Sequence, residues 1–454
     1  MPDLHGSLFM TRRTDQLKLG AFLANSGHHV AAWRHPLAQA DASLDFDHFK
    51  HIARTAERGK FDALFIADVV ALWGHHHDAL SRTARAEHFE PLTLMSALAA
   101  VTSNIGLIAT ATTTYNEPYH IARKFASLDH LSKGRAAWNL VTSVVSDEAW
   151  NFGREHHVGH GDRYQRAEEF HDVVKGLWDS WDDDAFTRDK ASGEYFDPAK
   201  LHTLNHRGEH FSVRGPLNVA RPPQGHPVLV QAGASEPGKN LAARVAELIF
   251  AHAHNLEGAQ TFYQDIKARA EAFGRDPDHV KILPGVTPFI ADTREQAQAL
   301  FEAFQALIDP VLGLRLLADT LGDDIDLSGH DLDGPLPQTP VGQRGSRRDK
   351  VLELARTENL SIRQLYLRLA GGNPVIGTAE DVADHFEAWF QARACDGFNV
   401  FFPYFPGAID LFVERVIPLL QARGLFRREY EGATLRENLG LPRPVNRFTQ
   451  GAPT

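Results

Sequence analysis

The sequence predicts a (β/α)8 TIM barrel that forms a single domain over residues 1–454. Short apolar runs alternate with longer helical patterns along the chain, as expected when each strand is followed by a helix. Eight such runs can be counted, which is the number that closes a parallel barrel. The glycine-rich GxGxxG turn that a doubly wound sheet needs after its first strand is absent.

The first half of the chain carries the pattern most clearly. We expect strands at 17–23 (LKLGAFL), 61–68 (FDALFIAD), 105–113 (IGLIATATT) and 134–143 (GRAAWNLVTS). The helices between them are expected at 46–59, 91–101 and 119–132, with a fourth from about Arg163 to Trp181. The glycine at 59 is the residue type that commonly ends a helix.

The second half continues the alternation less regularly. The remaining strands are expected at 226–233, 247–253, 280–291 and 397–402, with helices at 239–246, 258–273 and 408–423. Two stretches interrupt the rhythm. Residues from about 182 to 224 read as a polar excursion after the fourth helix, and residues from about 325 to 376 as a turn-rich insertion with a helix through about Arg356. Because the second lies between strands seven and eight, we expect a lid over the barrel mouth.

Composition narrows the class of protein. The 43% hydrophobic content suffices for a large core, and the net charge of -11 argues against nucleic-acid binding. A single cysteine, Cys395, excludes an intrachain disulfide and fits a reducing cytoplasm. Neither a signal peptide nor an apolar run long enough to span a membrane is evident. The tail from about 431 to 454 is expected to wrap a surface or a partner subunit.

Barrel enzymes build their sites at the carboxyl ends of the strands. His28 and His29 follow the first strand, where polar aromatic residues can line a pocket, although a surface loop is the alternative. Asp68 ends the second strand and could bind a ligand or cap a backbone amide. The histidines at 75–77 suggest a metal site, but adjacent loop residues seldom converge on one ion, so we expect a pocket rim or surface there.

The third and fourth strands end in hydroxyl and amide side chains. Thr110 and Thr112 alternate onto one side of the third strand, while Asn139 and Thr142 lie near the end of the fourth. Taken one at a time, such groups are usually satisfied within a barrel. Together, they favour a site for a planar heterocycle with donors and acceptors.

An anion site is expected after the fifth strand. Gly233, Ala234 and Ser235 precede a helix, and backbone amides at a helix N-terminus bind phosphate readily. His160 and Tyr164, at the start of the fourth helix, could also reach a phosphate.

These motifs resemble a known family. The strings HHVAAWRHP, FDALFIAD, NEPYHIARKFASLDHLSKGRAAWNLVTS, NFG, HGDRYQRAEEF and VLVQAGAS resemble the FMN-dependent monooxygenases of the bacterial luciferase-like superfamily. The resemblance runs from about Leu17 to Arg423, within the group of nitrilotriacetate, dibenzothiophene-sulfone and long-chain alkane monooxygenases and pristinamycin IIA synthase. The cysteine found early in the alkane-oxidising relative is missing here, which puts that activity in doubt.

The resemblance implies a role for each matching residue. The pocket for the flavin ring would be formed by Asp68, Thr110, Thr112, Asn139 and Thr142. The FMN phosphate would be bound by His160, Tyr164, Gly233, Ala234 and Ser235.

The chemistry implied is that of a two-component oxygenase. Reduced FMN, a co-substrate delivered by a separate NAD(P)H:flavin reductase, would react with O2 to give a flavin C4a-peroxide. That species would oxygenate a small sulfur- or nitrogen-containing compound such as a sulfone, thioether or aminopolycarboxylate. His28, His29 and Tyr115 are the candidates for proton transfer. We expect a homodimer or homotetramer that binds no nucleic acid, no membrane and no metal.

Three alternatives remain open. The first is an F420-dependent oxidoreductase on the same barrel, which would transfer hydride without oxygen. The second is a metal-dependent hydrolase, suggested by His252 and His254 after the sixth strand. The third is a relative that binds flavin without catalysis.

Overall fold

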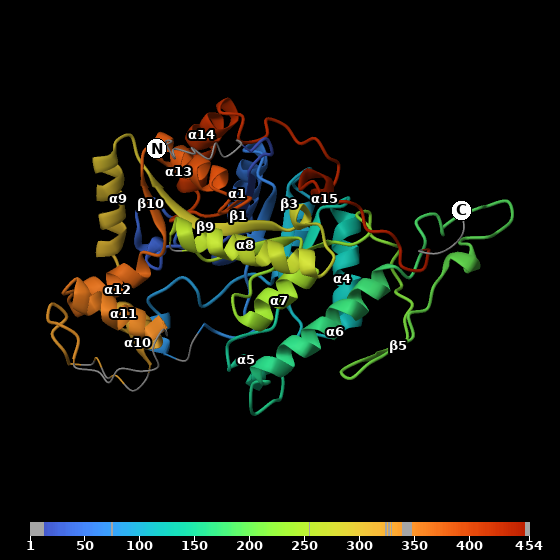
Figure 1. Ribbon diagram of the computed structural model, residues 1–454, viewed down its shortest axis with the longest axis horizontal. Coiled ribbons are helices and arrows are strands. Elements are labelled where there is room, and N and C mark those ends of the chain that lie inside the picture. The colour runs from blue at the N-terminus through green and yellow to red at the C-terminus, as the bar shows by residue number, and fades with distance from the viewer. Residues whose placement is uncertain are drawn as a thin grey trace, which may run out of the picture.

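A computed structural model describes residues 13–449, apart from 74–75, 254, 323–324, 326, 328 and 338–346. Its centre is a closed barrel of parallel strands surrounded by helices (Figure 1). Following hydrogen-bonded neighbours, the order is β1-β2-β3-β4-β7-β8-β9-β11, and β11 pairs with β1 to close the ring. The predicted barrel is therefore confirmed.

Each barrel strand lies within the range expected from the sequence. The strands are β1 (Lys18–Phe22), β2 (Ala63–Ile66), β3 (Gly106–Thr112), β4 (Ala136–Val141), β7 (Val228–Gln231), β8 (Leu248–Ala251), β9 (Lys281–Ile290) and β11 (Gly397–Phe401). The seam between the first and last strands is tight. A Cβ at Gly397 would lie 1.8 Å from the carbonyl oxygen of Lys18, so only glycine fits there.

Seven of the surrounding helices were expected, and their bounds shift by a few residues. They are α1 (Phe46–Arg58), α3 (Pro91–Ala99), α4 (Pro118–Leu131), α6 (His160–Trp178), α7 (Glu236–Val245), α8 (Leu256–Ala272) and α14 (Gly407–Ala422). The shifts matter at α6 and α7, which begin earlier than predicted. His160 is the first residue of α6, and Ser235 caps α7 directly.

The region between β9 and β11 holds more structure than the sequence analysis assigned. It contains α9 (Arg294–Ala306), α10 (Pro310–Leu321), α11 (Arg347–Thr357), α12 (Ile362–Ala370), β10 (Pro374–Gly377) and α13 (Ala379–Gln391). Strand β10 extends the sheet beside β9, and α13 packs with α14 against the barrel. Only a helix near α11 was predicted here.

Helices α10, α11 and α12 form a small core of their own at one side of the molecule (Figure 1). This core includes Leu317, Leu352 and Tyr366, together with Ala31 from the loop that follows β1. The expected insertion therefore packs on a loop at the carboxyl ends of the strands, although several of its residues lie outside the described part of the chain.

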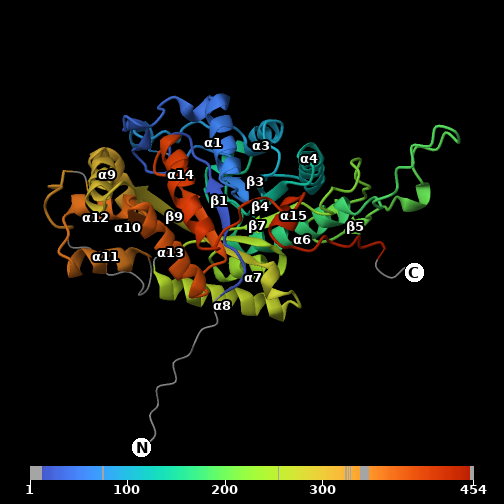
Figure 2. The same ribbon diagram turned by 90° about the horizontal axis from the view of Figure 1, so that it is seen from above.

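The remaining elements are short. They are the helices α2 (His77–Leu80), α5 (Glu148–Asn151) and α15 (Leu435–Asn438), the 3-10 turns at Ala32–Arg34, Ala42–Leu44, Pro198–Lys200 and Pro277–His279, and the antiparallel pair β5 (His206–Arg207) and β6 (Ser212–Val213). The segment expected as a polar excursion carries β5 and β6 and projects from the barrel (Figure 2). No helix in the described residues is long and apolar enough to cross a membrane.

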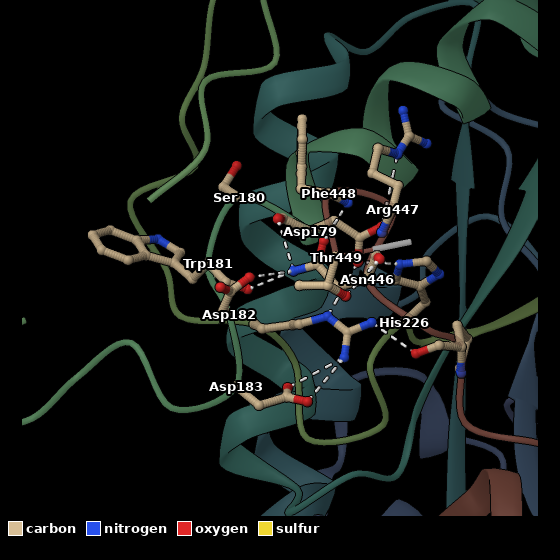
Figure 3. Close-up of polar contacts among 12 residues, drawn as sticks. Asp179, Ser180, Trp181, Asp182, Asp183, His226, Asn446, Arg447, Phe448 and Thr449 are labelled. Atoms are coloured by element: carbon tan, nitrogen blue, oxygen red, sulfur yellow. Dashed lines mark hydrogen bonds and ion pairs between the residues drawn. The ribbon is translucent and has the colours of Figure 1, made fainter. Parts of the chain in front are cut away.

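The chain after α14 packs against the body in two places. In the first, shown in Figure 3, Asn446 donates from Nδ2 to the carbonyls of Asp179 and Trp181, at 3.2 and 3.0 Å. The buried Asp179 also accepts from Nε2 of His226 at 2.8 Å and from the backbone amide of Arg447 at 3.3 Å. This part of the tail therefore covers the end of α6.

In the second place, α15 closes the amino-terminal mouth of the barrel. Leu435, Leu439 and Leu441 are buried in the same core as the interior strand residues Ala63, Ile108 and Val228. Arg436 donates from Nη2 to Glu247 at 2.9 Å, just before β8. One mouth is plugged by the protein itself, so we expect a ligand to enter from the other.

Candidate active site

Thr110 and Asn139 lie side by side at the open mouth, because β3 and β4 pair in register at these two residues. The Thr110 hydroxyl donates to the carbonyl of Ile66 at 2.6 Å and accepts from Nδ2 of Asn139 at 2.9 Å. The amide oxygen of Asn139 is buried and has no partner among the described residues. A buried acceptor left unpaired costs about 1–3 kcal/mol, which a ligand with an N–H donor would offset.

Thr112 belongs to an internal network. Its hydroxyl lies 2.8 Å from that of Ser143, which donates to Glu148 at 2.7 Å. The Thr112 hydroxyl also accepts from the backbone amide of Thr114 at 3.1 Å. Thr142 is buried beside this network, and its carbonyl accepts from the Thr114 hydroxyl at 2.8 Å. This network holds the ends of β3 and β4 together, and its members Ser143 and Glu148 were not among the residues predicted from the sequence.

Tyr115 is coupled to a histidine that the sequence analysis missed. Its hydroxyl lies 2.6 Å from Nδ1 of His157, and its ring stacks on Phe152 with centroids 4.8 Å apart. Nε2 of His157 faces a guanidinium nitrogen of Arg163 at 2.6 Å. Since guanidinium only donates, Nε2 accepts and the proton resides on Nδ1. Burial and Arg163 lower the pKa of His157, so this tautomer is neutral.

A pocket of about 380 Å³ opens at the carboxyl ends of β1, β2, β8 and β11. Its floor is aromatic: the rings of Phe22, Phe250 and Phe401 contact one another, with centroids 4.7–6.0 Å apart. Its polar lining residues are Asn25, His28, Arg85, His88 and His252. A mostly apolar pocket with a few polar groups is typical of small-molecule sites.

His28 lies in the wall of this pocket. Its ring stacks on Phe401, and Nδ1 lies 3.4 Å from the carbonyl oxygen of Phe402. A carbonyl only accepts, so Nδ1 carries the proton and Nε2 is left as an acceptor. Nε2 is buried and has no partner among the described residues. Burial lowers the pKa of His28 to about 3, which keeps the ring neutral.

His29 points elsewhere. Its Nδ1 accepts from the amide of Ala31 at 3.2 Å, and its Nε2 donates to the side chain of Gln305 at 3.0 Å. The ring is buried against Phe304 of α9, and burial lowers its pKa to about 4. His29 therefore joins the loop after β1 to the inserted helices and does not line the pocket described above.

Asp68 is paired with a pocket residue. Its Oδ1 accepts from Nε2 of His88 at 3.0 Å, and this hydrogen bond raises the pKa of His88. The carboxylate thus orients the His88 ring at the pocket wall. Of the expected histidine triplet, His75 lies outside the described residues.

The expected anion site lies at the start of α7. The Ser235 hydroxyl accepts from the amide of Gly238 at 3.2 Å and lies 3.4 Å from the Tyr164 hydroxyl. The ring of His160 lies 5.0 Å from that of Tyr164, so α6 and α7 bring these side chains together. One member of the expected nest is already engaged, because the Gly233 amide donates to the side chain of Gln231 at 2.6 Å. Ala234 is exposed at the helix entrance.

No group of three metal-binding side chains occurs among the described residues. His254, half of the pair that suggested a hydrolase, is outside that part of the chain.

Comparison with known proteins identifies the family. Residues 26–396 match the model of the luciferase-like monooxygenases. The chain belongs to this family. Along 97% of its length, it is 55% identical to N-acetyl-S-(2-succino)cysteine monooxygenase of Bacillus subtilis (strain 168), covering all of that protein. Along 95%, it is 51% identical to component A of nitrilotriacetate monooxygenase from Aminobacter aminovorans, covering 98% of it.

Solved structures at 33–34% identity share the fold. DmoA from Hyphomicrobium sulfonivorans superposes with a TM-score of 0.85 at 34% identity, over 94% of this chain and 92% of that one. A riboflavin lyase, solved with modified FMN and its substrate riboflavin, gives 0.81 at 33% identity, over 94% and 96%. The chain therefore has the barrel fold of the luciferase-like monooxygenases, as the resemblance in the sequence predicted.

The side chains at the open mouth fit a flavin. The unpaired oxygen of Asn139 suits the N–H of an isoalloxazine ring, and Thr110 fixes the amide that carries it. The start of α7, with Ser235 and Tyr164, offers hydroxyls and a helix N-terminus to a phosphate. Thr112, by contrast, is engaged within the protein.

Two basic pocket residues were not predicted from the sequence. Arg85 and His88 come from the loop between α2 and α3, about twenty residues after β2. That loop has no regular pattern of apolar residues. The usable signal was chemical: two basic side chains close together before the helix that follows a barrel strand.

Proposed function

We propose that this chain is the oxygenase component of a two-component system. It would use reduced FMN and O2 to oxygenate a small sulfur- or nitrogen-containing compound. The observation that carries the proposal is the similarity over 95% or more of the chain to proteins named as monooxygenases, one of them a component A. A separate NAD(P)H:flavin reductase would supply the reduced flavin. The unpaired oxygen of Asn139 and the start of α7 support this proposal, because they offer partners for a flavin ring and for a phosphate, and the pocket at the ends of β1, β2, β8 and β11 offers room for the substrate.

The roles of the residues follow from their surroundings. Asn139 and Thr110 would orient the flavin ring, and Ser235, Tyr164 and the amide of Ala234 would bind its phosphate. His160 lies beside Tyr164 and would add a donor. When bound, the reduced flavin supplies the electrons that activate oxygen.

The protein itself supplies a dry site and a place for protons. The rings of Phe22, Phe250 and Phe401 exclude water from the pocket floor. Nε2 of His28 is an unprotonated acceptor and can accept a hydrogen bond from a reacting group. The hydroxyl of Tyr115, which accepts from His157, keeps its own proton available for donation.

Oxygen consumption tests this proposal. The purified chain would be supplied with reduced FMN by a separate flavin reductase and NADH, and offered sulfones, thioethers and aminopolycarboxylates. We expect substrate-dependent O2 uptake and a product one oxygen atom heavier. Oxidation of reduced F420 with no oxygen incorporated would instead identify the hydride-transferring alternative, and flavin binding with no turnover would indicate a non-catalytic relative.

A further inference from the structure

The pocket at the open mouth carries an unbalanced charge. Among the described residues, its lining has one arginine, Arg85, and three histidines, but no aspartate or glutamate. Asp68 stands behind His88 and is not part of the lining. An anion entering this pocket would therefore meet a cation and no opposing carboxylate.

Arg85 has no acidic partner within the described part of the chain. Its one hydrogen bond runs from Nη2 to the carbonyl of His28 at 3.3 Å, which fixes the guanidinium beside the pocket wall. Although the residue as a whole is exposed, the atoms packed around its head lower its pKa by loss of hydration, with no carboxylate compensating. By contrast, the nearby Arg82 faces Asp309 at 3.8 Å.

The rest of the guanidinium remains available. It has five N–H donors in a planar fork, a geometry that matches a carboxylate with two parallel hydrogen bonds. A second N–H-bearing ring lies in the same wall: His88 donates from Nε2 to Asp68 at 3.0 Å, and this hydrogen bond raises the pKa of His88. In contrast to this polar wall, the floor formed by Phe22, Phe250 and Phe401 is apolar. The pocket thus suits a ligand with an anionic end and a less polar body.

We infer that Arg85 selects substrates bearing a carboxylate, binding that group at the pocket wall while the sulfur or nitrogen to be oxygenated rests toward the aromatic floor. The inference rests on the proposed function and narrows its substrate class. Neutral sulfones and alkanes would leave the guanidinium dehydrated and unpaired, so they would bind poorly. The substrates named for the two curated relatives, N-acetyl-S-(2-succino)cysteine and nitrilotriacetate, carry such carboxylates.

Calorimetric binding to the full chain tests the inference without turnover. The probes are N-acetyl-S-(2-succino)cysteine, nitrilotriacetate and ethylenediaminetetraacetate, each beside its full methyl ester. We expect at least one acid to bind the wild-type protein tenfold or more tightly than its ester. In R85M, the affinity for that acid should fall about 10- to 100-fold, and that for the ester less than threefold. R85K should lie between, because a lysine keeps the charge but not the fork.

R82M is the matched control: it removes an arginine from the same loop and should leave the preference for the acid intact. Titration with FMN should give the same affinity for R85M and the wild type, which shows that the variant is folded and that Arg85 does not serve the phosphate. The inference is overturned if no acid binds better than its ester, or if the preference survives in R85M.

The two proposals fail separately. If the wild-type protein consumes oxygen with a neutral thioether but shows no preference for any acid, the carboxylate site is wrong and the oxygenase stands. If an acid binds through Arg85 but reduced FMN supports no oxygenation of any probe, the binding site stands and the oxygenase is wrong.

Discussion

The imidazole of His28 stacks on the phenyl ring of Phe401, with centroids 4.6 Å apart and planes inclined by only 9°. The residues come from opposite ends of the chain and meet because β11 closes the barrel against β1. Stacking fixes the ring plane, and the carbonyl of Phe402 fixes the tautomer. A neutral acceptor is thereby held at the wall of the pocket.

Replacing His28 by phenylalanine should preserve this stack but remove the acceptor. Because Nε2 would then no longer accept a hydrogen bond from the reacting group, we expect kcat with the best substrate to fall by about 10- to 100-fold while KM changes little. H35F is the matched control, because His35 also stacks on a phenylalanine, Phe304, at 4.0 Å, but lies outside the pocket lining. Steady-state oxygen uptake measures both. Activity of H28F within threefold of wild type would contradict a role of this acceptor in the reaction.

Buried histidines should make the protein sensitive to acid. Burial lowers the pKa of His28 to about 3, and those of His29, His226 and His385 to about 4, from 6.5. Between about pH 6.5 and pH 4, these histidines are therefore protonated in the unfolded chain but neutral in the folded protein. Stability is fully present above about pH 7 and is lost as the pH falls toward 4, at about 1.4 kcal/mol per pH unit for each histidine.

Urea denaturation at pH 7, 6 and 5 measures this dependence. H385F, which places another ring against Phe386 and Trp389, should lower the slope by one histidine's share. H156Q, at an exposed position, should leave it unchanged. A free energy of unfolding that stays constant from pH 7 to pH 5 would show that these rings are not kept neutral by burial.

Ser235→Ala should weaken FMN binding and destabilise α7. Loss of one charge-assisted hydrogen bond of about 1.5–3 kcal/mol corresponds to about 10- to 100-fold in affinity. Loss of the helix cap costs about 1 kcal/mol in stability. Riboflavin, which lacks the phosphate, should bind the wild type and the variant alike.

T293A is its matched control. Thr293 caps α9 by accepting from the amide of Gln296 at 3.2 Å, far along the chain from the expected phosphate site. This variant should lose stability by a similar amount while FMN affinity, measured well below the melting temperature, remains the same. Equal weakening of FMN and riboflavin by S235A would exclude the phosphate assignment.

Arg436→Met should strongly destabilise the barrel. Arg436 and Glu247 have side chains only 3% and 17% exposed, and removing one partner of a buried pair costs about 3–5 kcal/mol. R443M, which breaks an ion pair with Asp183 at 45% and 55% exposure, should cost less than about 1 kcal/mol. Chemical denaturation measures the free energy of unfolding of the two variants. A similar loss of stability in both would show that α15 is held in the mouth by its leucines alone.

The sequence predicts the barrel well because its strands are buried on both faces. Runs such as FDALFIAD are continuous and apolar, and a parallel barrel requires this pattern. The inserted helices were missed because their buried sides are narrow: α9 buries only Ala297 and Phe304. Their N-caps could nevertheless be recognised in the sequence, since Thr293 precedes α9, and Thr378 forms a capping box with Asp381 at α13.

The site was predictable only in part. Thr110 and Asn139 follow from strand register, which places residues at the same height on neighbouring strands. The sequence cannot distinguish His28 from His29, because both follow β1 and only packing decides which one faces the pocket. Arg85 reaches His28 across 57 residues of chain, and no local pattern reveals such a contact.

The closure of the barrel by its ends has a consequence for biosynthesis. Strand β1 needs β11 as its neighbour, and the interior core is completed by leucines between residues 435 and 441. Nearly the whole chain must leave the ribosome before either can be satisfied. Until then, β1 has an open edge and the hydrophobic interior at the amino-terminal mouth is exposed to water. The nascent protein is therefore prone to aggregation for most of its synthesis. Slowing translation before residue 441 would prolong that exposure, whereas slowing it after that residue would not.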